Sequence, residues 1–280
     1  MNAPVFIRGF SKIASQYDAT ICDVWGVVHN GVDAFQPAID AIRRFRMERG
    51  PAILLSNAPR LADGVEAQFV RLGIPLDFYD GIVTSGSVAR EDLIRRLDGR
   101  GELPLFYLGP ARDNPVFHGL NIRFVDVDAA ELVFCTGLLD DDSEVPADYL
   151  KTLETFHARR LPFLCANPDV VVQRGDRLVY CAGALARLYE SLGGRVIYFG
   201  KPHRAVFERA LEMARRISPA DKAIVIGDGI ETDIGGARNL NLDALFIAGG
   251  IHAGDDEAAL AKLFQENRVQ AVAAMRALCW

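Results

Sequence analysis

Short apolar runs alternate with helix-like segments from one end of this chain to the other. Runs such as 19–23, 52–55 and 223–226 have the length of buried strands, and each precedes a segment with apolar residues at helical spacing. Parallel strands need a crossover connection, and a helix usually supplies it. The alternation therefore predicts an α/β fold with a doubly wound parallel sheet, a Rossmann-like arrangement.

The middle of the chain has a different pattern of predicted elements, with short strands separated by less regular helices. We interpret residues 87–189 as a second α/β unit, called the cap below, inserted into a discontinuous core of residues 1–86 and 190–280. The other predicted core elements are strands at 81–83, 196–199 and 244–247 and a last helix at 269–278. Cap strands are predicted at 105–108, 122–125, 132–135 and 163–166.

Composition limits the partners and the compartment that we expect. A net charge of -6 argues against nucleic acid as a main partner, because phosphate backbones require a basic face. The five cysteines are odd in number and form no CxxC pair, which argues against a zinc site or a disulfide framework and favours a reducing cytoplasm. The sequence has no signal-peptide pattern and no apolar run of membrane-spanning length, so we expect no membrane partner.

Polar residues follow three of the predicted core strands directly. They are Asp23, the pair Ser56 and Asn57, and Asp228. In open α/β sheets, ligands bind at the carboxyl ends of the strands, so we expect these side chains to share one site. A carboxylate in the position of Asp23 can attack phosphorus or carbon and form a covalent intermediate.

The segment Gly227–Asp233 places the carboxylates of Asp228 and Asp233 on one tight loop between a strand and a helix. Such hard oxygen ligands suit Mg²⁺, and we expect Asp228 to bind it. For Asp233, a place beside the metal and a helix N-cap fit the spacing equally well. Lys201, between a glycine and a proline after a predicted strand, is suited to balance the charge of Asp23 and of an incoming anion.

The joint order of these motifs resembles the haloacid dehalogenase-like superfamily over nearly the whole chain. In this resemblance Asp23 is the nucleophile, Ser56 and Asn57 hold the transferred group, and Lys201 is the third-motif lysine. The resemblance implies an Mg²⁺ cofactor and an aspartyl-phosphate intermediate. The metal residues that it implies are Asp23, the backbone carbonyl of Trp25, Asp228 and Asp233.

Three further segments are similar to the class IIA branch of that superfamily, which includes sugar-phosphate, nucleotide and pyridoxal-phosphate phosphatases. They are Thr84–Gly86, Ala166–Asp169 and the order from Gly183 to Pro202. The resemblance implies a small phosphorylated metabolite as substrate, selected by the cap loop at Asn167, Pro168 and Asp169. By resemblance alone, we also expect a homodimer that pairs through the cap.

The sequence departs from that family at Trp25. The family's phosphatases carry an aspartate at this position as general acid and base, and an indole cannot exchange a proton near neutral pH. Losing such a group typically costs ~10²–10⁴-fold in rate. His29, His203 and Glu231 are candidate replacements, although a structural role is the simpler expectation for both histidines.

Three functional hypotheses follow from this departure. The first is an Mg²⁺-dependent phosphatase, a phosphoric monoester hydrolase, favoured by the acidic loop and the cap pattern. The second is an Mg²⁺-independent hydrolase acting at carbon, because the true haloacid dehalogenases have an aromatic residue at the position of Trp25. The third is a non-catalytic protein that binds a phosphorylated metabolite. The acidic run Asp140–Asp142 is interpreted as a solvated loop of the cap.

Overall fold

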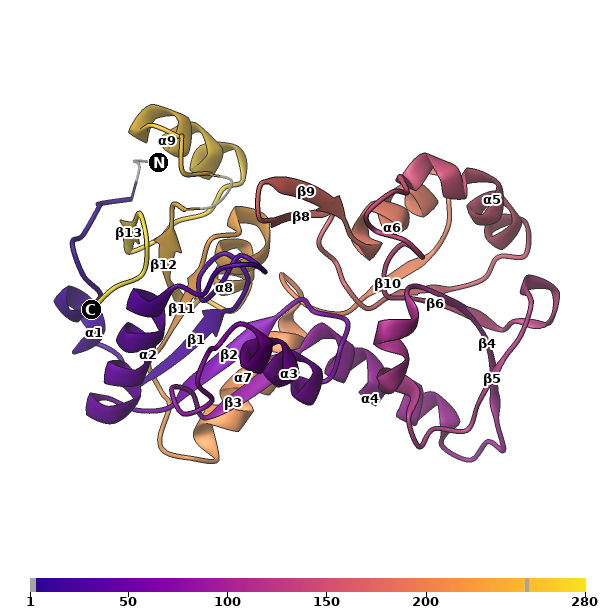
Figure 1. Ribbon diagram of the computed structural model, residues 1–280, viewed down its shortest axis with the longest axis horizontal. Helices are drawn as coiled ribbons and strands as arrows, with labels where there is room; N and C mark the ends of the chain where they lie inside the picture. The colour runs from indigo at the N-terminus through magenta and orange to yellow at the C-terminus, as the bar shows by residue number, and fades with distance from the viewer. Residues whose placement is uncertain (1–3, 250–251) are drawn as a thin grey trace.

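The computed structural model describes residues 4–249 and 252–280 and centres on a six-stranded sheet (Figure 1). Every strand pair in it is parallel. Its strands, in spatial order, are β13 (Ala273–Met275), β12 (Asp243–Ile247), β11 (Ala223–Gly227), β1 (Ala19–Asp23), β2 (Ala52–Ser56) and β3 (Gly81–Thr84). The central strands are buried along their whole length, as expected for a parallel sheet covered on both faces.

Helices cover both faces of this sheet because successive strand residues point to opposite sides. On β1, Ile21 packs into one apolar cluster and Cys22 into the other. Helices α1 (Ser11–Ala14), α2 (Gln36–Glu48) and α3 (Ala62–Arg71) contribute to the cluster of Cys22. Helices α4 (Ser85–Leu97), α7 (Arg204–Arg215), α8 (Gly235–Asn239) and α9 (Glu257–Glu266) contribute to that of Ile21.

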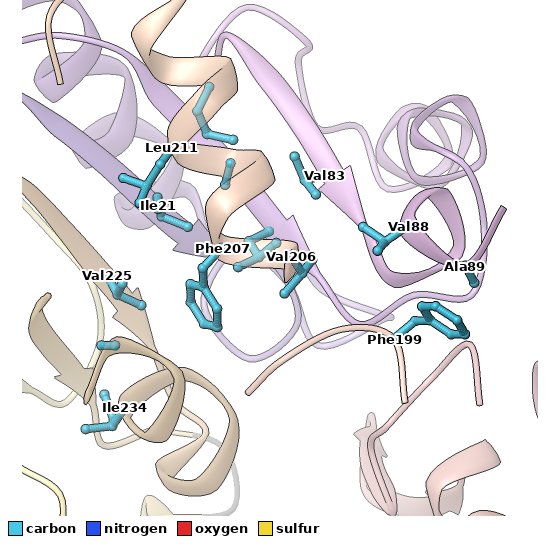
Figure 2. Packing of buried hydrophobic residues seen from close by; sticks show 14 of the residues in the cluster. Ile21, Val83, Val88, Ala89, Phe199, Val206, Phe207, Leu211, Val225 and Ile234 are labelled. Carbon is cyan, nitrogen blue, oxygen red and sulfur yellow. The ribbon is translucent and has the colours of Figure 1, made fainter. Parts of the chain in front are cut away.

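Figure 2 shows how α7 packs on the sheet. Its residues Val206, Phe207 and Leu211 lie in one cluster with Ile21 and Val83 from the strands. This cluster continues into the cap and joins the two units through apolar contact.

A second parallel sheet forms the cap, in the order β10-β7-β6-β4-β5. The strands are β4 (Leu103–Leu108), β5 (Ile122–Phe124), β6 (Leu132–Cys135), β7 (Phe163–Cys165) and β10 (Val196–Tyr198). Its helices are α5 (Leu150–Ala158) and α6 (Ala182–Ser191), with short 3₁₀ turns η1 (Ala111–Phe117), η2 (Val127–Ala129) and η3 (Pro146–Tyr149). An antiparallel hairpin of β8 (Val171–Arg174) and β9 (Arg177–Tyr180) reaches from the cap toward the core (Figure 1).

The α/β fold class is confirmed, but one predicted strand lies in the other sheet and one predicted helix is wrong. The strand expected at 196–199 in the core is β10, which pairs with β7 in the cap sheet. After α6 the chain adds one more parallel strand to the cap before it returns to the core. We therefore propose that the cap extends to about Tyr198 rather than to residue 189.

The helix expected at 269–278 is also wrong, since this segment contains strand β13. Its alanine-rich sequence has helix propensity, but Ala273–Met275 pairs with β12 on one side. On the other side, the backbone of Ala274 exchanges hydrogen bonds with Val5 and Ile7. This tertiary pairing overrides a weak local preference. Among the described residues, no helix is both long and apolar enough to span a membrane.

The core packing predicts a large stability loss for Phe207→Ala. Phe207 is fully buried, so truncation leaves a cavity and should lower the free energy of unfolding by about 3–5 kcal/mol. Urea unfolding followed by circular dichroism measures this change. The control Met47→Ala, at a position that is 76% exposed, should stay within about 0.5 kcal/mol of wild type. Equal losses in both variants would contradict the packing described here.

Candidate active site

Three neighbouring strands bring the predicted polar residues to one edge of the sheet. Asp23 is the last residue of β1, Ser56 is the last residue of β2, and Asp228 follows the end of β11. Strand β1 lies between β2 and β11. The carboxyl ends of the strands therefore collect these side chains, as the sequence predicts.

Lys201 lies between two of the carboxylates. Its Nζ donates to Oδ1 of Asp23 and, at 2.8 Å, to Oδ1 of Asp233. The three residues are buried, with exposed fractions of 3%, 5% and 1%. Burial lowers the pKa of Lys201, but Asp23 and Asp233 outweigh this effect and raise the pKa above its usual value. Lys201 is therefore a cation beside Asp23, as the sequence predicts.

Asn57 joins the core, the lysine loop and the cap. Its Oδ1 accepts a hydrogen bond from the backbone N–H of Lys201 at 2.7 Å. Its Nδ2 donates to Oδ1 of Asp169 in the cap at 2.8 Å. Ser56 lines the same cavity, and its Oγ accepts a hydrogen bond from the backbone N–H of Ala58 at 3.1 Å. The asparagine thus fixes the backbone at Lys201 as well as facing the site.

Two glycines let the acidic side chains approach the loops. Gly26 has a φ of +87°, and a Cβ there would lie 2.0 Å from Oδ2 of Asp228. A Cβ at Gly227 would lie 2.2 Å from Cγ of Asp233. Any larger residue at either position would displace a carboxylate, so both glycines are required by the geometry of the site.

Asp233 lies inside the helical turn Ile230–Ile234 and not at the N-cap of α8. Its Oδ2 accepts a hydrogen bond from the backbone N–H of Gly229 at 3.1 Å, and its Oδ1 accepts one from Lys201. The side chain thus ties the acidic loop to the lysine. Of the two sequence interpretations, a simple cap of the following helix does not describe these contacts.

Three carboxylates converge at this edge. Oxygen atoms of Asp23, Asp228 and Asp233 all lie within 4.8 Å of one another. Burial, and next the charge of Asp233, raises the pKa of Asp23 well above its usual range and that of Asp228 to about 7. A single buried ammonium, Lys201, accompanies the three. This excess of hard, negatively charged oxygen donors fits a small divalent cation such as Mg²⁺.

Trp25 forms a contact between core and cap that no sequence pattern predicts. Its indole Nε1 donates to the backbone carbonyl of Gln173 in β8 at 2.7 Å. The ring packs edge-on against His29, with centroids 5.1 Å apart. Gly31 has a φ of +88°, and a Cβ there would lie 2.5 Å from the indole. The side chain of Trp25 is therefore held in place, and its N–H forms a hydrogen bond with the cap.

Of the three proposed replacements for the missing acid, His29 and Glu231 line the cavity and His203 does not. His29 is buried between the rings of Trp25 and Phe69, and burial lowers its pKa to about 4, so it is neutral near pH 7. His203 stacks on a tyrosine of β10 outside the cavity lining. Glu231 is exposed and forms an ion pair with a cap arginine at 3.1 Å.

Core and cap together enclose a cavity of about 940 Å³, within the size range of small-molecule sites. The core lines it with Asp23, Lys201 and Asp228, and the cap with Asp169 and Arg174. Sequence reasoning placed the loop of Asp169 near the substrate, and the cavity lining agrees with that expectation.

The acidic run Asp140–Asp142 is not simply solvated, as its sequence suggested. Asp141 is only 10% exposed on its side chain and forms an ion pair with Arg174 at 2.8 Å. It also pairs with Arg112. Burial acts to raise the pKa of Asp141, but the two arginines outweigh it and lower the pKa. This carboxylate therefore orients two arginines that line the cavity.

The indole hydrogen bond predicts that Trp25→Phe loosens the hairpin. The variant keeps a ring but loses a bond worth about 1 kcal/mol, so the open population of the hairpin should rise about fivefold. Amide hydrogen exchange of residues 171–180 measures this change. The control Trp280→Phe removes the chain's other tryptophan, which packs on Phe10 in the core, and should leave the hairpin unchanged. Unaltered exchange in Trp25→Phe would refute the contact.

The raised pKa of Asp228 predicts a pH-dependent stability without metal. The folded protein keeps this proton up to about pH 7, whereas an unfolded chain releases it near pH 4. Between these values the unfolded state binds fewer protons, so stability falls as the pH rises. Urea unfolding in chelator should show a flatter dependence in Asp228→Asn. The exposed control Asp63→Asn should keep the wild-type slope, and identical slopes in all three proteins would contradict the prediction.

Comparison with known proteins supports the resemblance to the haloacid dehalogenase-like superfamily. A model described as "Haloacid dehalogenase-like hydrolase" matches residues 20–123, and a HAD-hydrolase-like model matches residues 198–273. "Ribonucleotide monophosphatase NagD" of Escherichia coli K12 is 23% identical, over 84% of this chain and 89% of that protein. The glycerol phosphate phosphatase Rv1692 of Mycobacterium tuberculosis, crystallised with magnesium, has a TM-score of 0.62 and 23% identity over 84% and 68% of the two chains.

A crystal structure from Brucella suis 1330 is much more similar in sequence. It is described as a hydrolase of the haloacid dehalogenase-like family, with 43% identity and a TM-score of 0.87. The match covers 98% of this chain and 100% of that one. The chain therefore belongs to the haloacid dehalogenase-like hydrolase superfamily, in the class IIA branch of phosphoric monoester hydrolases.

Proposed function

We propose that this protein is an Mg²⁺-dependent phosphatase that hydrolyses a small phosphorylated metabolite through an aspartyl-phosphate on Asp23. One observation carries the proposal above the others. The carboxylate of Asp23 lies at the end of β1, bonded to Lys201 and grouped with Asp228 and Asp233, in a cavity closed by the cap. A nucleophile, a cation and a cluster of metal-type ligands thus occur together.

The residues of the site have different roles in phosphoryl transfer. Asp23 attacks phosphorus, and the Lys201 ammonium lowers the pKa of Asp23 against the effect of burial, so it favours the ionised nucleophile. Lys201, Ser56 and Asn57 are placed to stabilise the oxygens of the transferring group. Positioning and charge supply most of the catalysis in this reaction class. Water then releases phosphate from Asp23.

Asp23, the backbone carbonyl of Trp25 and Asp228 are the residues that would hold Mg²⁺. When bound, the ion would neutralise the clustered carboxylates and the phosphoryl oxygens. Asp233, which bonds Lys201 and the backbone of its own loop, would support these ligands from behind. The magnesium found with the Mycobacterium tuberculosis relative is consistent with this proposal.

The cavity and the relatives both point to a small anionic substrate. Its volume accommodates a small metabolite, and its cap side carries Arg112 and Arg174. The relative from Escherichia coli is named for nucleotides, which supports the class and leaves the individual metabolite open. A cytoplasmic location and a homodimer formed through the cap remain part of the proposal.

The two rival hypotheses gain no support from the site. The carbon-centred reaction rested on the aromatic residue at position 25, but the indole N–H of Trp25 bonds the cap. The non-catalytic hypothesis rested on the missing acid, yet the nucleophile, the lysine and the acidic cluster are all assembled. The relatives are hydrolases and phosphatases by name, so phosphatase activity is the function we propose.

Hydrolysis of p-nitrophenyl phosphate tests this function directly. Wild type should release nitrophenolate with Mg²⁺ and lose this activity in excess chelator, because the carboxylate cluster then repels the substrate. Asp23→Asn should lower the rate to background, since an amide cannot form the intermediate. The control Asp63→Asn, exposed on α3, should keep wild-type activity. Full activity in chelator, or in Asp23→Asn, would disprove the proposal.

A further inference from the structure

One cap segment is attached to the core at both of its ends. At residue 169, the carboxylate accepts a hydrogen bond from Asn57 at 2.8 Å. At residue 173, the backbone carbonyl accepts one from the Trp25 indole at 2.7 Å. Both core partners follow the carboxyl ends of strands that carry the site. This segment therefore has a defined position over the nucleophile when the cap is closed.

The carboxyl group of Asp169 is unlike that of Asp113, the other cap aspartate held by the core. Asp113 is paired with a charged group, since the guanidinium of Arg60 bonds its Oδ1 at 3.1 Å. Asp169 has only the neutral amide of Asn57 on Oδ1, and among the described residues no hydrogen bond is recorded to its Oδ2. Asp169 lines the cavity that holds Asp23. It thus has an oxygen available to a substrate.

The burial of Asp169 favours its protonated form. Burial raises its pKa above the usual aspartate range, although Lys201 and the amide of Asn57 act in the opposite direction. The core groups that face it are Lys201, Asp228 and Asp233, and on the cap side Cys165 and Cys181 are close enough to feel its charge. A raised pKa suits an acid that works near neutral pH.

We propose that Asp169, supplied by the cap, is the general acid and base that the core lacks at Trp25, and that Trp25 positions the segment carrying it. This inference rests on the proposed phosphatase function. It explains the substitution at position 25 in physical terms. The indole of Trp25 cannot transfer a proton, but its N–H donates the hydrogen bond that holds the cap segment in place.

The proton balance of both steps is complete. As Asp23 attacks phosphorus, the bond from phosphorus to the ester oxygen breaks, and Asp169 gives its proton to the departing alkoxide. Asp169 is then a carboxylate. It takes a proton from the water that attacks the aspartyl-phosphate, the bond from phosphorus to Asp23 breaks, and inorganic phosphate leaves with Asp169 protonated again.

The test compares two leaving groups in Asp169→Asn. For 2-glycerol phosphate, whose alkoxide needs a proton, kcat should fall ~10²–10⁴-fold, the usual loss for an acid. Nitrophenolate leaves without protonation, so p-nitrophenyl phosphate should still give a burst of one product per active site in a quenched-flow experiment. Slow turnover should follow, because the base for the second step is missing.

Asp113→Asn is the matched control, because it removes a second buried cap carboxylate that lines the same cavity and contacts the core. If it loosens the cap, both substrates should slow by the same factor, without a burst. Trp25→Phe, as a positioning variant, should slow 2-glycerol phosphate by up to about fivefold and spare the nitrophenolate burst.

The outcomes separate the two proposals. Two results would show that Asp169 is not the acid: Asp169→Asn slows the hydrolysis of both substrates equally without a burst, or it keeps wild-type rates. In either case the proposed phosphatase function stands. If wild type with Mg²⁺ hydrolyses neither substrate, the proposed function fails and this inference fails with it. A burst followed by slow turnover in Asp169→Asn alone supports both.

Discussion

A buried lysine between two carboxylates holds this site together. Lys201 contacts Asp23 and Asp233 at once, and all three side chains are removed from water. Burying charge is costly unless it is paired, and here three carboxylates share one ammonium. The remaining negative charge keeps the pKa of Asp23 and of Asp228 high. The strand ends and the tight glycine loops bring the carboxylates together, and the affinity for a divalent cation that we propose follows from this imbalance.

The cap completes the site through a few polar contacts. Asn57 bonds Asp169, Trp25 bonds Gln173 and Arg60 pairs with Asp113, each joining core to cap. These contacts lie beside the cavity, so cap position and site chemistry are linked. These contacts account for the substitution at position 25. The indole N–H of Trp25 forms a hydrogen bond between core and cap, whereas an aspartate at this position would take part in the reaction.

Local patterns predicted the regular parts of the fold well and the ambiguous segments poorly. The strand residues Ala19–Asp23 and Ala223–Gly227 are buried on both sides and appear as mostly apolar runs. By contrast, Val196–Tyr198 is a short run that either sheet could accept, and it joined the cap. Ala273–Met275 favours a helix locally and became a strand through pairing with distant chain. Short segments take their partners from tertiary structure, which periodicity does not encode.

The sequence by itself determined the α/β class, the carboxylates and the lysine of the site, because strand periodicity and the residues at strand ends are local properties. Tertiary structure alone decided that Trp25 bonds Gln173, 148 positions away, that His29 is enclosed by aromatic rings, and that Asn57 bonds Asp169. The bond between Trp25 and Gln173 depends on how the core and the cap meet, and the ring contacts of His29 depend on packing within the core. The geometry of these contacts follows from tertiary packing, and residue spacing along the chain does not predict it.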